Sequence, residues 1–171
     1  MDHTKVKQGD KVLIYAGAGG VGSLAIQMAK HLGAYVATTA SEKNEAYVKE
    51  LGADAFINYR TQQFEEEVSD YDVVIDTMGG EILNKSFQIV KPGGRLVTIA
   101  GQPDPALAEK HQVTASSYWL TPNGKQLSEL GELLEKGILK PQVGHVFDFS
   151  AEALQRAHEL SETHHANGRL S

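Results

Sequence analysis

The chain has 171 residues, of which 41% are hydrophobic and 22% charged, a balance that supports one folded domain with a buried core. The net charge of −6 argues against non-specific nucleic-acid binding and against binding to an anionic membrane surface. The absence of cysteine excludes disulfides and thiolate zinc sites within this chain.

Strand-like apolar runs alternate with helical patterns in the first two thirds of the chain. The predicted strands are Lys11–Ala16, Tyr35–Thr39, Ala55–Asn58, Tyr71–Asp76, Arg95–Ala100 and Val113–Ser117. Helical spacing and capping residues predict helices over Val21–Leu32, Ser41–Leu51, Thr61–Val68 and Glu81–Val90, the last one stopped by Lys91–Gly94.

The remaining predicted elements are shorter and less regular. They are a loop or one-turn helix at Pro105–Lys110, a helix from Thr121-Pro122 to about Lys136, a turn at Gly137–Pro141, a strand at Val143–Phe149 and a helix from its cap at Ser150 to about Ser161.

Alternation of strands and helices predicts right-handed βαβ crossovers. We therefore expect the α/β fold of a doubly wound parallel sheet (Rossmann), with strand order 3-2-1-4-5-6 and helices on both faces. Ligands bind such sheets at the carboxyl ends of the first and fourth strands. A mild boundary near Pro141 divides residues 1–141, the sheet domain, from residues 142–171, a tail of one strand and one helix.

A glycine turn joins the first predicted strand to the first predicted helix. Gly17, Gly19 and Gly22 form Gly-x-Gly-x-x-Gly in the strand–turn–helix context of a dinucleotide-binding site. Gly17 is expected to allow the tight turn, Gly19 the approach of a pyrophosphate, and Gly22 the close packing of the helix. The N–H groups at the helix start then face an anion. The alternative is a glycine-rich turn that only packs.

The end of the second strand indicates which dinucleotide binds. NAD enzymes usually carry an acidic residue there for the ribose 2′-hydroxyl, but this chain has Ala40 and Ser41. Ser41 can donate a hydrogen bond and Lys43 supplies positive charge, which together favour NADP(H). Glu42 is the competing acid, although an acid is also favoured in a first helical turn by the dipole alone. Lys43 could instead be a solvated lysine.

Several motifs in order extend this pattern over nearly the whole chain. They are Gly9–Gly22, Leu51–Tyr59, Tyr71–Asp76, Lys91–Val97, Lys136–Pro141, Val146-Phe147 and Gly168–Leu170. Together they strongly resemble the cofactor domain of the medium-chain dehydrogenase/reductase superfamily. The chain is similar to its quinone oxidoreductase or enone reductase branch, zinc-binding alcohol dehydrogenase-like proteins that use NADPH.

The resemblance implies roles for residues at the ends of the strands. It places Gly19, Gly20 and Val21 at the pyrophosphate, and Ser41, Lys43 and Tyr59 around the adenosine 2′-phosphate. It places Asp76, Thr77 and Met78 near the adenosine and the nicotinamide ribose, and the backbone of Ile99, Ala100 and Gly101 at the nicotinamide. Two alternatives stay open: Tyr59 could be a packing aromatic, and Asp76 could simply cap the turn at Gly79-Gly80.

The resemblance also implies an N-terminal catalytic domain that this chain does not include. Substrate residues, a proton donor and any catalytic zinc would lie there, so no catalytic residue is assigned in this chain. The tail, residues 142–171, would pack with that domain. The implied reaction is hydride transfer from NADPH to a small-molecule carbonyl or quinone, and we expect this chain alone to have little or no activity.

Ser116 to Trp119 place two aromatic residues at the end of the sixth strand. In the resembling family this strand pairs across a homodimer; the alternative is core packing or an exposed patch. Adjacent histidines His164 and His165 do not face one site on a helix, so we expect no metal.

No apolar run approaches the about 20 residues that span a bilayer, and the N-terminus does not resemble a signal peptide. The sequence thus predicts a soluble, cytoplasmic protein with no membrane or nucleic-acid partner. Two rival functions remain: a non-catalytic nucleotide-binding or interaction module that kept the fold, and a methyltransferase-like domain, which the full glycine spacing disfavours.

Overall fold

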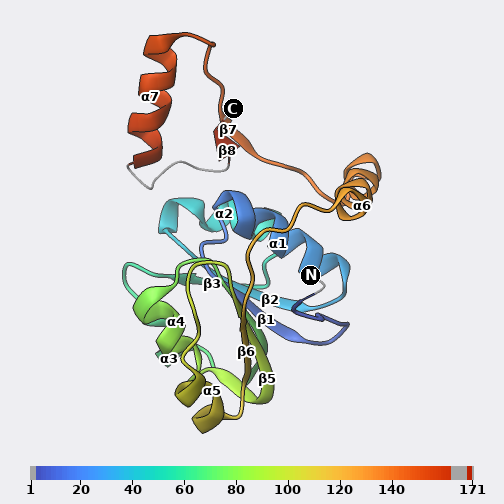
Figure 1. Ribbon diagram of the computed structural model, residues 1–171, viewed down its shortest axis with the longest axis vertical. Coiled ribbons are helices and arrows are strands. Elements are labelled where there is room, and N and C mark those ends of the chain that lie inside the picture. Colours follow the sequence, from blue (N-terminus) through green and yellow to red (C-terminus); the bar gives the residue numbers. More distant parts are fainter. Residues whose placement is uncertain (1–2, 163–168, 171) are drawn as a thin grey trace.

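A computed structural model describes residues 3–162 and 169–170 (Figure 1). Its main feature is a six-stranded parallel sheet in the order β3-β2-β1-β4-β5-β6. The strands are β1 (Lys11–Ile14), β2 (Tyr35–Ala40), β3 (Ala55–Asn58), β4 (Tyr71–Asp76), β5 (Val90–Thr98) and β6 (Thr114–Ser117). The doubly wound fold and its strand order, both predicted from the sequence, are confirmed.

Helices cover both faces of this sheet (Figure 1). They are α1 (Gly20–His31), a 3₁₀ helix η1 (Glu42–Asn44), α2 (Glu45–Glu50), α3 (Phe64–Glu67), α4 (Gly80–Ser86) and α5 (Pro105–His111). Successive residues of β1 point to opposite faces, which builds two cores. Val12 and Ile14 join a core with Ile26 of α1, whereas Leu13 joins a second core with Phe87 after α4.

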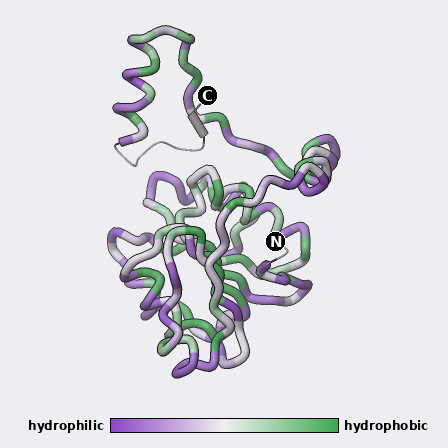
Figure 2. Tube along the Cα trace, in the orientation of Figure 1, coloured by the Kyte–Doolittle hydropathy of each residue, from purple (hydrophilic) through white to green (hydrophobic). Residues whose placement is uncertain are grey.

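The later elements lie outside this sheet. They are α6 (Gly124–Glu135), β7 (Val143–His145), α7 (Ala151–Glu162) and β8 (Arg169–Leu170). Figure 1 shows β7, β8 and α7 apart from the six strands, with β7 and β8 forming a two-stranded parallel sheet. Figure 2 shows hydrophobic residues on this tail, and Val146 and Phe149 are 78% and 97% exposed. The division at residue 141, and the packing of the tail with another domain, stay predictions.

Three predicted helix boundaries are wrong, and the strand predicted over Val143–Phe149 is shorter, because β7 ends at His145. The helix expected over Glu81–Val90 is α4 and ends at Ser86, because Val90 already pairs with Tyr71 as the first residue of β5. The expected stop at Lys91–Gly94 therefore lies inside β5, as an irregular stretch before Arg95 pairs with Val73.

The other two wrong boundaries are helix starts. Helix α6 begins at Gly124 instead of Thr121-Pro122, because the Asn123 side chain accepts hydrogen bonds from the N–H groups of Lys125 and Gln126. Helix α3 begins at Phe64 without a cap from Thr61. The cap of α7 is confirmed, since the Ser150 hydroxyl accepts a hydrogen bond from the Ala153 N–H.

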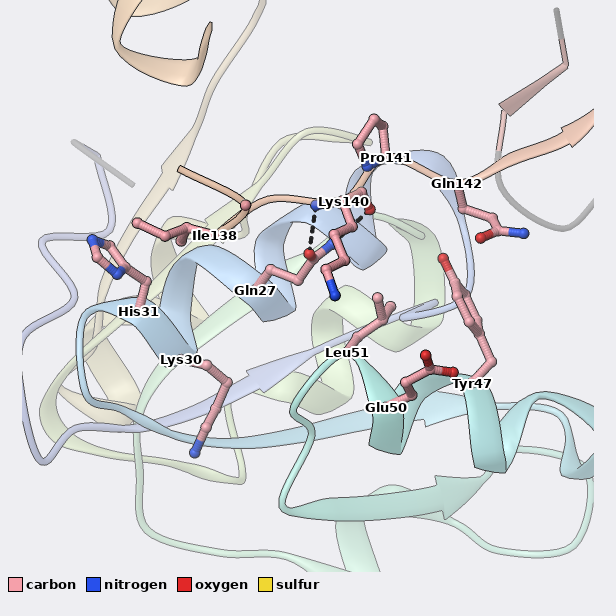
Figure 3. Close-up of a pocket in the computed structure, with 11 residues that line it drawn as sticks. Gln27, Lys30, His31, Tyr47, Glu50, Leu51, Ile138, Lys140, Pro141 and Gln142 are labelled. Carbon is pink, nitrogen blue, oxygen red and sulfur yellow. Dashed lines mark hydrogen bonds between the residues drawn. The ribbon is translucent and has the colours of Figure 1, made fainter. Parts of the chain in front are cut away.

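Helix α1 is joined to the chain segment that leads to the tail. The amide of Gln27 accepts from the Lys140 N–H at 2.8 Å and donates to the Lys140 carbonyl at 3.2 Å (Figure 3). It also donates to the Ser23 carbonyl at 3.0 Å. These contacts close one wall of a pocket of about 490 Å³ between α1, α2 and residues 137–142. One side chain thus fixes where the chain leaves the sheet domain.

Replacing Gln27 with alanine should release this segment. Gln27 is 7% exposed but Lys140 is an exposed residue, so water can replace part of the lost hydrogen bonds and the expected cost is about 1 kcal/mol. Hydrogen exchange at the Lys140 amide should become faster, and thermal unfolding should report the lost stability. The matched control is Gln155→Ala on the exposed face of α7, expected to change stability by about 0.5 kcal/mol or less. Unchanged exchange at Lys140 would refute the role of Gln27.

Candidate cofactor site

The glycine turn after β1 lies against β2. The N–H groups of Ala16 and Gly17 donate to Thr39, at 3.1 Å to its hydroxyl and 3.0 Å to its carbonyl. A Cβ on Gly17 would lie 2.1 Å from the Thr38 hydroxyl oxygen, so only glycine fits there. The positive φ of the turn, 51°, belongs to Ala16 instead. Gly17 is therefore required for close approach to β2 rather than for an unusual backbone conformation.

The other two glycines of the motif shape the start of α1. A Cβ on Gly22 would lie 2.3 Å from the Ala16 carbonyl oxygen, which confirms that this glycine allows close packing of the helix on the strand end. Gly19 is the N-cap residue of α1, and a Cβ there would lie 3.2 Å from the same oxygen. The backbone at Ala16 therefore lies in close contact with the first turn of α1.

The N-terminus of α1 is open to an anion. No side chain caps it, and its first turn contains no acidic residue. The first N–H groups of a helix have no intrahelical acceptor, and the helix dipole adds positive potential there. Gly20 is exposed and Val21 is 52% exposed. These are the features of a pyrophosphate cradle, and the residues present fit that group.

The ends of β2 and β3 lie next to each other, because Ala40 pairs with Asn58. Ser41, which follows Ala40, is 6% exposed, and its hydroxyl oxygen accepts a hydrogen bond from the Asn44 amide at 3.2 Å. Tyr59, which follows Asn58, is 53% exposed. Lys43 and its acidic neighbour Glu42 are also exposed, both within η1.

The carboxylate of Asp76 is completely buried at the end of β4. It accepts hydrogen bonds from the N–H groups of Met78 and Gly79 at 3.0–3.1 Å and from the Thr98 hydroxyl at 2.6 Å. These contacts are those expected if Asp76 caps the turn at Gly79-Gly80, which was the alternative to a role at the cofactor. Gly79 has φ 72°, and a Cβ there would lie 2.2 Å from the Ala100 carbonyl oxygen. Asp76 therefore holds the turn after β4 against the turn after β5.

The residues around these two turns face outward to different degrees. Thr77 is half-buried and its hydroxyl donates to the Tyr15 carbonyl at 3.0 Å, whereas Met78 is 53% exposed. Ile99, Ala100 and Gly101 are exposed at the end of β5. The structure thus brings the carboxyl ends of β1, β4 and β5 together, as the sheet topology requires.

A cleft of about 920 Å³ opens at this edge of the sheet. Its lining comprises Ala16, Thr39, Tyr59, Gln62, Gln63, Phe64, Glu65, Met78, Glu81, Ile82, Lys85 and Ser161. Of the residues that the sequence analysis placed at the cofactor, Tyr59 and Met78 line this cleft. The lining residues of α3 and α4 were not identified from the sequence, because their spacing is the same for a helix face that lines a cleft and for any other helix face.

Glu65 illustrates what the sequence could not show about this cleft. The acidic run Glu65 to Glu67 suggests an exposed helix face, but the Glu65 side chain is only 14% exposed and pairs with Lys85 at 2.6 Å. The hydrogen bond from Lys85 lowers the pKa of the Glu65 carboxyl, and the same contact raises the pKa of the Lys85 ammonium. Both groups are charged at neutral pH and join α3 to α4.

Residues 3–162 and 169–170 contain no cluster of three potential metal ligands among His, Asp and Glu. His164 and His165 lie outside the described residues. In the same described ranges, no helix is both long and apolar enough to cross a membrane.

Comparison with known proteins agrees with the dinucleotide-binding fold described above. The family model described as zinc-binding dehydrogenase matches residues 51–170. The chain belongs to this family. A second model, the C-terminal domain of alanine dehydrogenase/PNT, matches residues 3–81. The resemblance to medium-chain dehydrogenases/reductases is thereby confirmed. The zinc in the family's description has no ligand cluster in the described part of this chain.

Individual relatives and solved structures match this chain over nearly its full length. The chloroplastic NADPH-dependent alkenal/one oxidoreductase of Arabidopsis thaliana is 35% identical over 98% of the chain and 41% of its own length. The quinone oxidoreductase structure from Coxiella burnetii is 39% identical, with a TM-score of 0.91, over 99% of the chain and 54% of its own. A mycobacterial structure complexed with NADPH is 27% identical, with a TM-score of 0.82, over 96% of the chain and 56% of its own. The chain thus spans about half of these relatives or less.

Proposed function

We propose that this chain is the NADP(H)-binding domain of an oxidoreductase that reduces quinones or α,β-unsaturated carbonyls. The observation that carries the proposal is the uncapped start of α1, which has no acid in its first turn and lies beside the end of β2. At that strand end Ala40 and Ser41 take the place of the usual acid, and Lys43 follows in η1. The names of the Arabidopsis relative and of the mycobacterial NADPH complex support the choice of cofactor. The whole enzyme's activity and substrates are part of this proposal.

The role of this chain's residues is to bind NADP(H) and to orient it. The N–H groups of Gly20 and Val21 hold the pyrophosphate, which lies against Gly19, whose own N–H donates to the Ala16 carbonyl at 2.9 Å. Ser41, Lys43 and Tyr59 surround the 2′-phosphate. The backbone of residues 99–101 lies where the nicotinamide binds, on a turn that Asp76 keeps in place. When bound, NADPH supplies a hydride to the electrophilic carbon or quinone. Steady-state assays with quinones and enones distinguish this function from a non-catalytic module.

Replacing Lys43 with glutamate should weaken NADPH binding selectively. The substitution removes a charge-assisted contact to the 2′-phosphate and adds repulsion, so we expect NADPH affinity to fall by at least roughly tenfold. NADH has no 2′-phosphate, and its affinity should change by less than about twofold, since no charged contact is lost. Titration followed by nicotinamide fluorescence measures both.

The control for Lys43→Glu is Lys136→Glu, which makes the same change in net charge at the C-terminal end of α6. It should leave the NADPH-to-NADH preference unchanged. Equal affinity of the unaltered chain for NADPH and NADH would refute the NADP(H) assignment.

We further propose how this domain assembles. Residues 1–141 form the NADP(H)-binding domain, and residues 142–171 pack with an N-terminal catalytic domain, which would cover the exposed Val146 and Phe149. The edge strand β6 mediates a homodimer, where Trp119 and Leu120 are 84% and 77% exposed in the chain by itself. A cytoplasmic location stays a prediction.

A further inference from the structure

Two neighbouring turns at the carboxyl edge of the sheet are each fixed by an asparagine. After β2, Asn44 donates its N–H to the Ser41 carbonyl at 2.8 Å and its side-chain amide to the Ser41 hydroxyl at 3.2 Å. After β3, the Asn58 side chain accepts the Arg60 N–H at 3.1 Å, and the Gln62 side chain accepts the Asn58 N–H at 2.8 Å. Both turns are therefore ordered by their own hydrogen bonds before any ligand binds.

The turns begin at the same level of the sheet. Ala40 and Asn58 are paired residues of β2 and β3, and the Tyr59 N–H donates to the Ala40 carbonyl at 3.4 Å. The first turn then carries Lys43 two residues after Ser41, and the second carries Arg60 two residues after Asn58. The register of the sheet thus presents one cation from each turn at one edge.

Neither cation is paired with a carboxylate in the described part of the chain, although both are exposed. Nearby cations behave differently: Lys30 pairs with Asp54 at 2.8 Å, and Lys49 with Glu45 at 2.6 Å. One exposed acid, Glu42, shares the edge, so the local balance stays positive.

The Arg60 guanidinium lies 6.0 Å from the centre of the Tyr59 ring. A cation over an aromatic face gains only about 0.5–1 kcal/mol at an exposed site, but the ring limits the positions of the guanidinium. The planar fork of arginine matches a phosphate bidentately, which a lysine cannot do. Tyr59 and Arg60 together therefore form a preorganised anion-binding unit next to Ser41.

We propose that Arg60 is a second cationic, specificity-determining residue for the ribose 2′-phosphate, acting with Lys43, and that Tyr59 positions its guanidinium. The inference rests on the proposed function, because it concerns the phosphate that distinguishes NADPH from NADH. It adds a phosphate-binding residue, from the turn after β3, to Ser41, Lys43 and Tyr59, the group that the family resemblance implies.

The test is calorimetric titration of the chain and its variants with two ligand pairs, NADPH with NADH, and 2′,5′-ADP with 5′-AMP. Arg60→Ala should weaken NADPH and 2′,5′-ADP by roughly tenfold, the value of a hydrogen bond to a charged group. NADH and 5′-AMP affinities should stay within about twofold, because neither carries the 2′-phosphate. Arg60→Lys keeps the charge without the fork and should lie between Arg60→Ala and the unaltered chain.

Arg156→Ala on α7 is the matched control, since it removes an exposed arginine elsewhere and should change no affinity. If Arg60→Ala lowers the affinities within each pair equally, or lowers none, the role of Arg60 is refuted. If Lys43→Glu still weakens NADPH selectively in that case, the proposed function stands without Arg60. If the unaltered chain does not prefer the 2′-phosphorylated member of either pair, both proposals fail.

Discussion

Replacing Gly22 with alanine is expected to abolish measurable NADPH binding and to destabilise the fold. The new Cβ would lie 2.3 Å from the Ala16 carbonyl oxygen and 2.8 Å from the Gly17 Cα, which are both backbone atoms. Backbone cannot yield as the end of a flexible side chain does, so α1 must move away from the strand end. Overpacking of this kind costs about 1–3 kcal/mol. The same movement displaces the N–H groups at the start of α1.

Urea unfolding and NADPH titration measure the two effects of Gly22→Ala separately. The control is Gly131→Ala inside α6, where a Cβ would meet no atom within 4 Å. That substitution should stabilise the chain by about 0.5–1 kcal/mol, because alanine is a better helix former than glycine. An unaltered unfolding midpoint and unaltered NADPH affinity in Gly22→Ala would contradict the packing role of this glycine.

Replacing Asp76 with alanine should cost about 3 kcal/mol or more in unfolding free energy. The substitution leaves the N–H groups of Met78 and Gly79 and the Thr98 hydroxyl without their acceptor, and the carboxylate they lose is fully buried. The turn after β4 would then no longer be held to β5, so NADPH affinity should fall as well. Denaturant unfolding and NADPH titration check both expectations.

Asp76→Asn provides the graded control for this site. Asparagine keeps one acceptor oxygen for the turn but replaces the other with a donor, so its loss of stability should be smaller than that of Asp76→Ala. Thr98→Val removes the hydroxyl that donates to Asp76 and accepts from the Ala100 N–H at 3.0 Å, and it should also destabilise. If Asp76→Ala unfolds within about 0.5 kcal/mol of the unaltered chain, the carboxylate does not hold the turn.

Local patterns were sufficient to predict the sheet and the kind of site. The alternation of short apolar runs with helical spacing leads to the order 3-2-1-4-5-6, because crossover handedness and strand length leave few other arrangements. The glycine spacing between a strand and a helix predicts the turn, and its position at the carboxyl edge follows from the same topology. The acid-free end of β2 is likewise visible in the sequence alone.

Three features were predicted wrongly from the sequence: the end of α4, the start of α6 and the exposure of Glu65. Val90 looks like the end of a helix until its pairing with Tyr71 makes it the start of β5. Thr121-Pro122 looks like a helix start, but the stronger cap is Asn123 two residues later. Glu65 looks like an exposed acid until Lys85, 20 residues further along, reaches it from α4. In the first and third cases the deciding contact involves a residue that is far away in the sequence.

The sequence by itself determined the doubly wound sheet, the glycine turn and the lack of an acid at Ala40 and Ser41, where β2 ends, because each depends on residues within one strand, turn or helix. The tertiary structure decided what the individual residues do. It shows that Gly17 is required by Thr38, that Asp76 is bonded to Thr98, and that Arg60 lies over Tyr59 beside the end of β2. Steric fit and hydrogen bonding act over a few ångströms, so these roles exist only once folding has brought separate segments together.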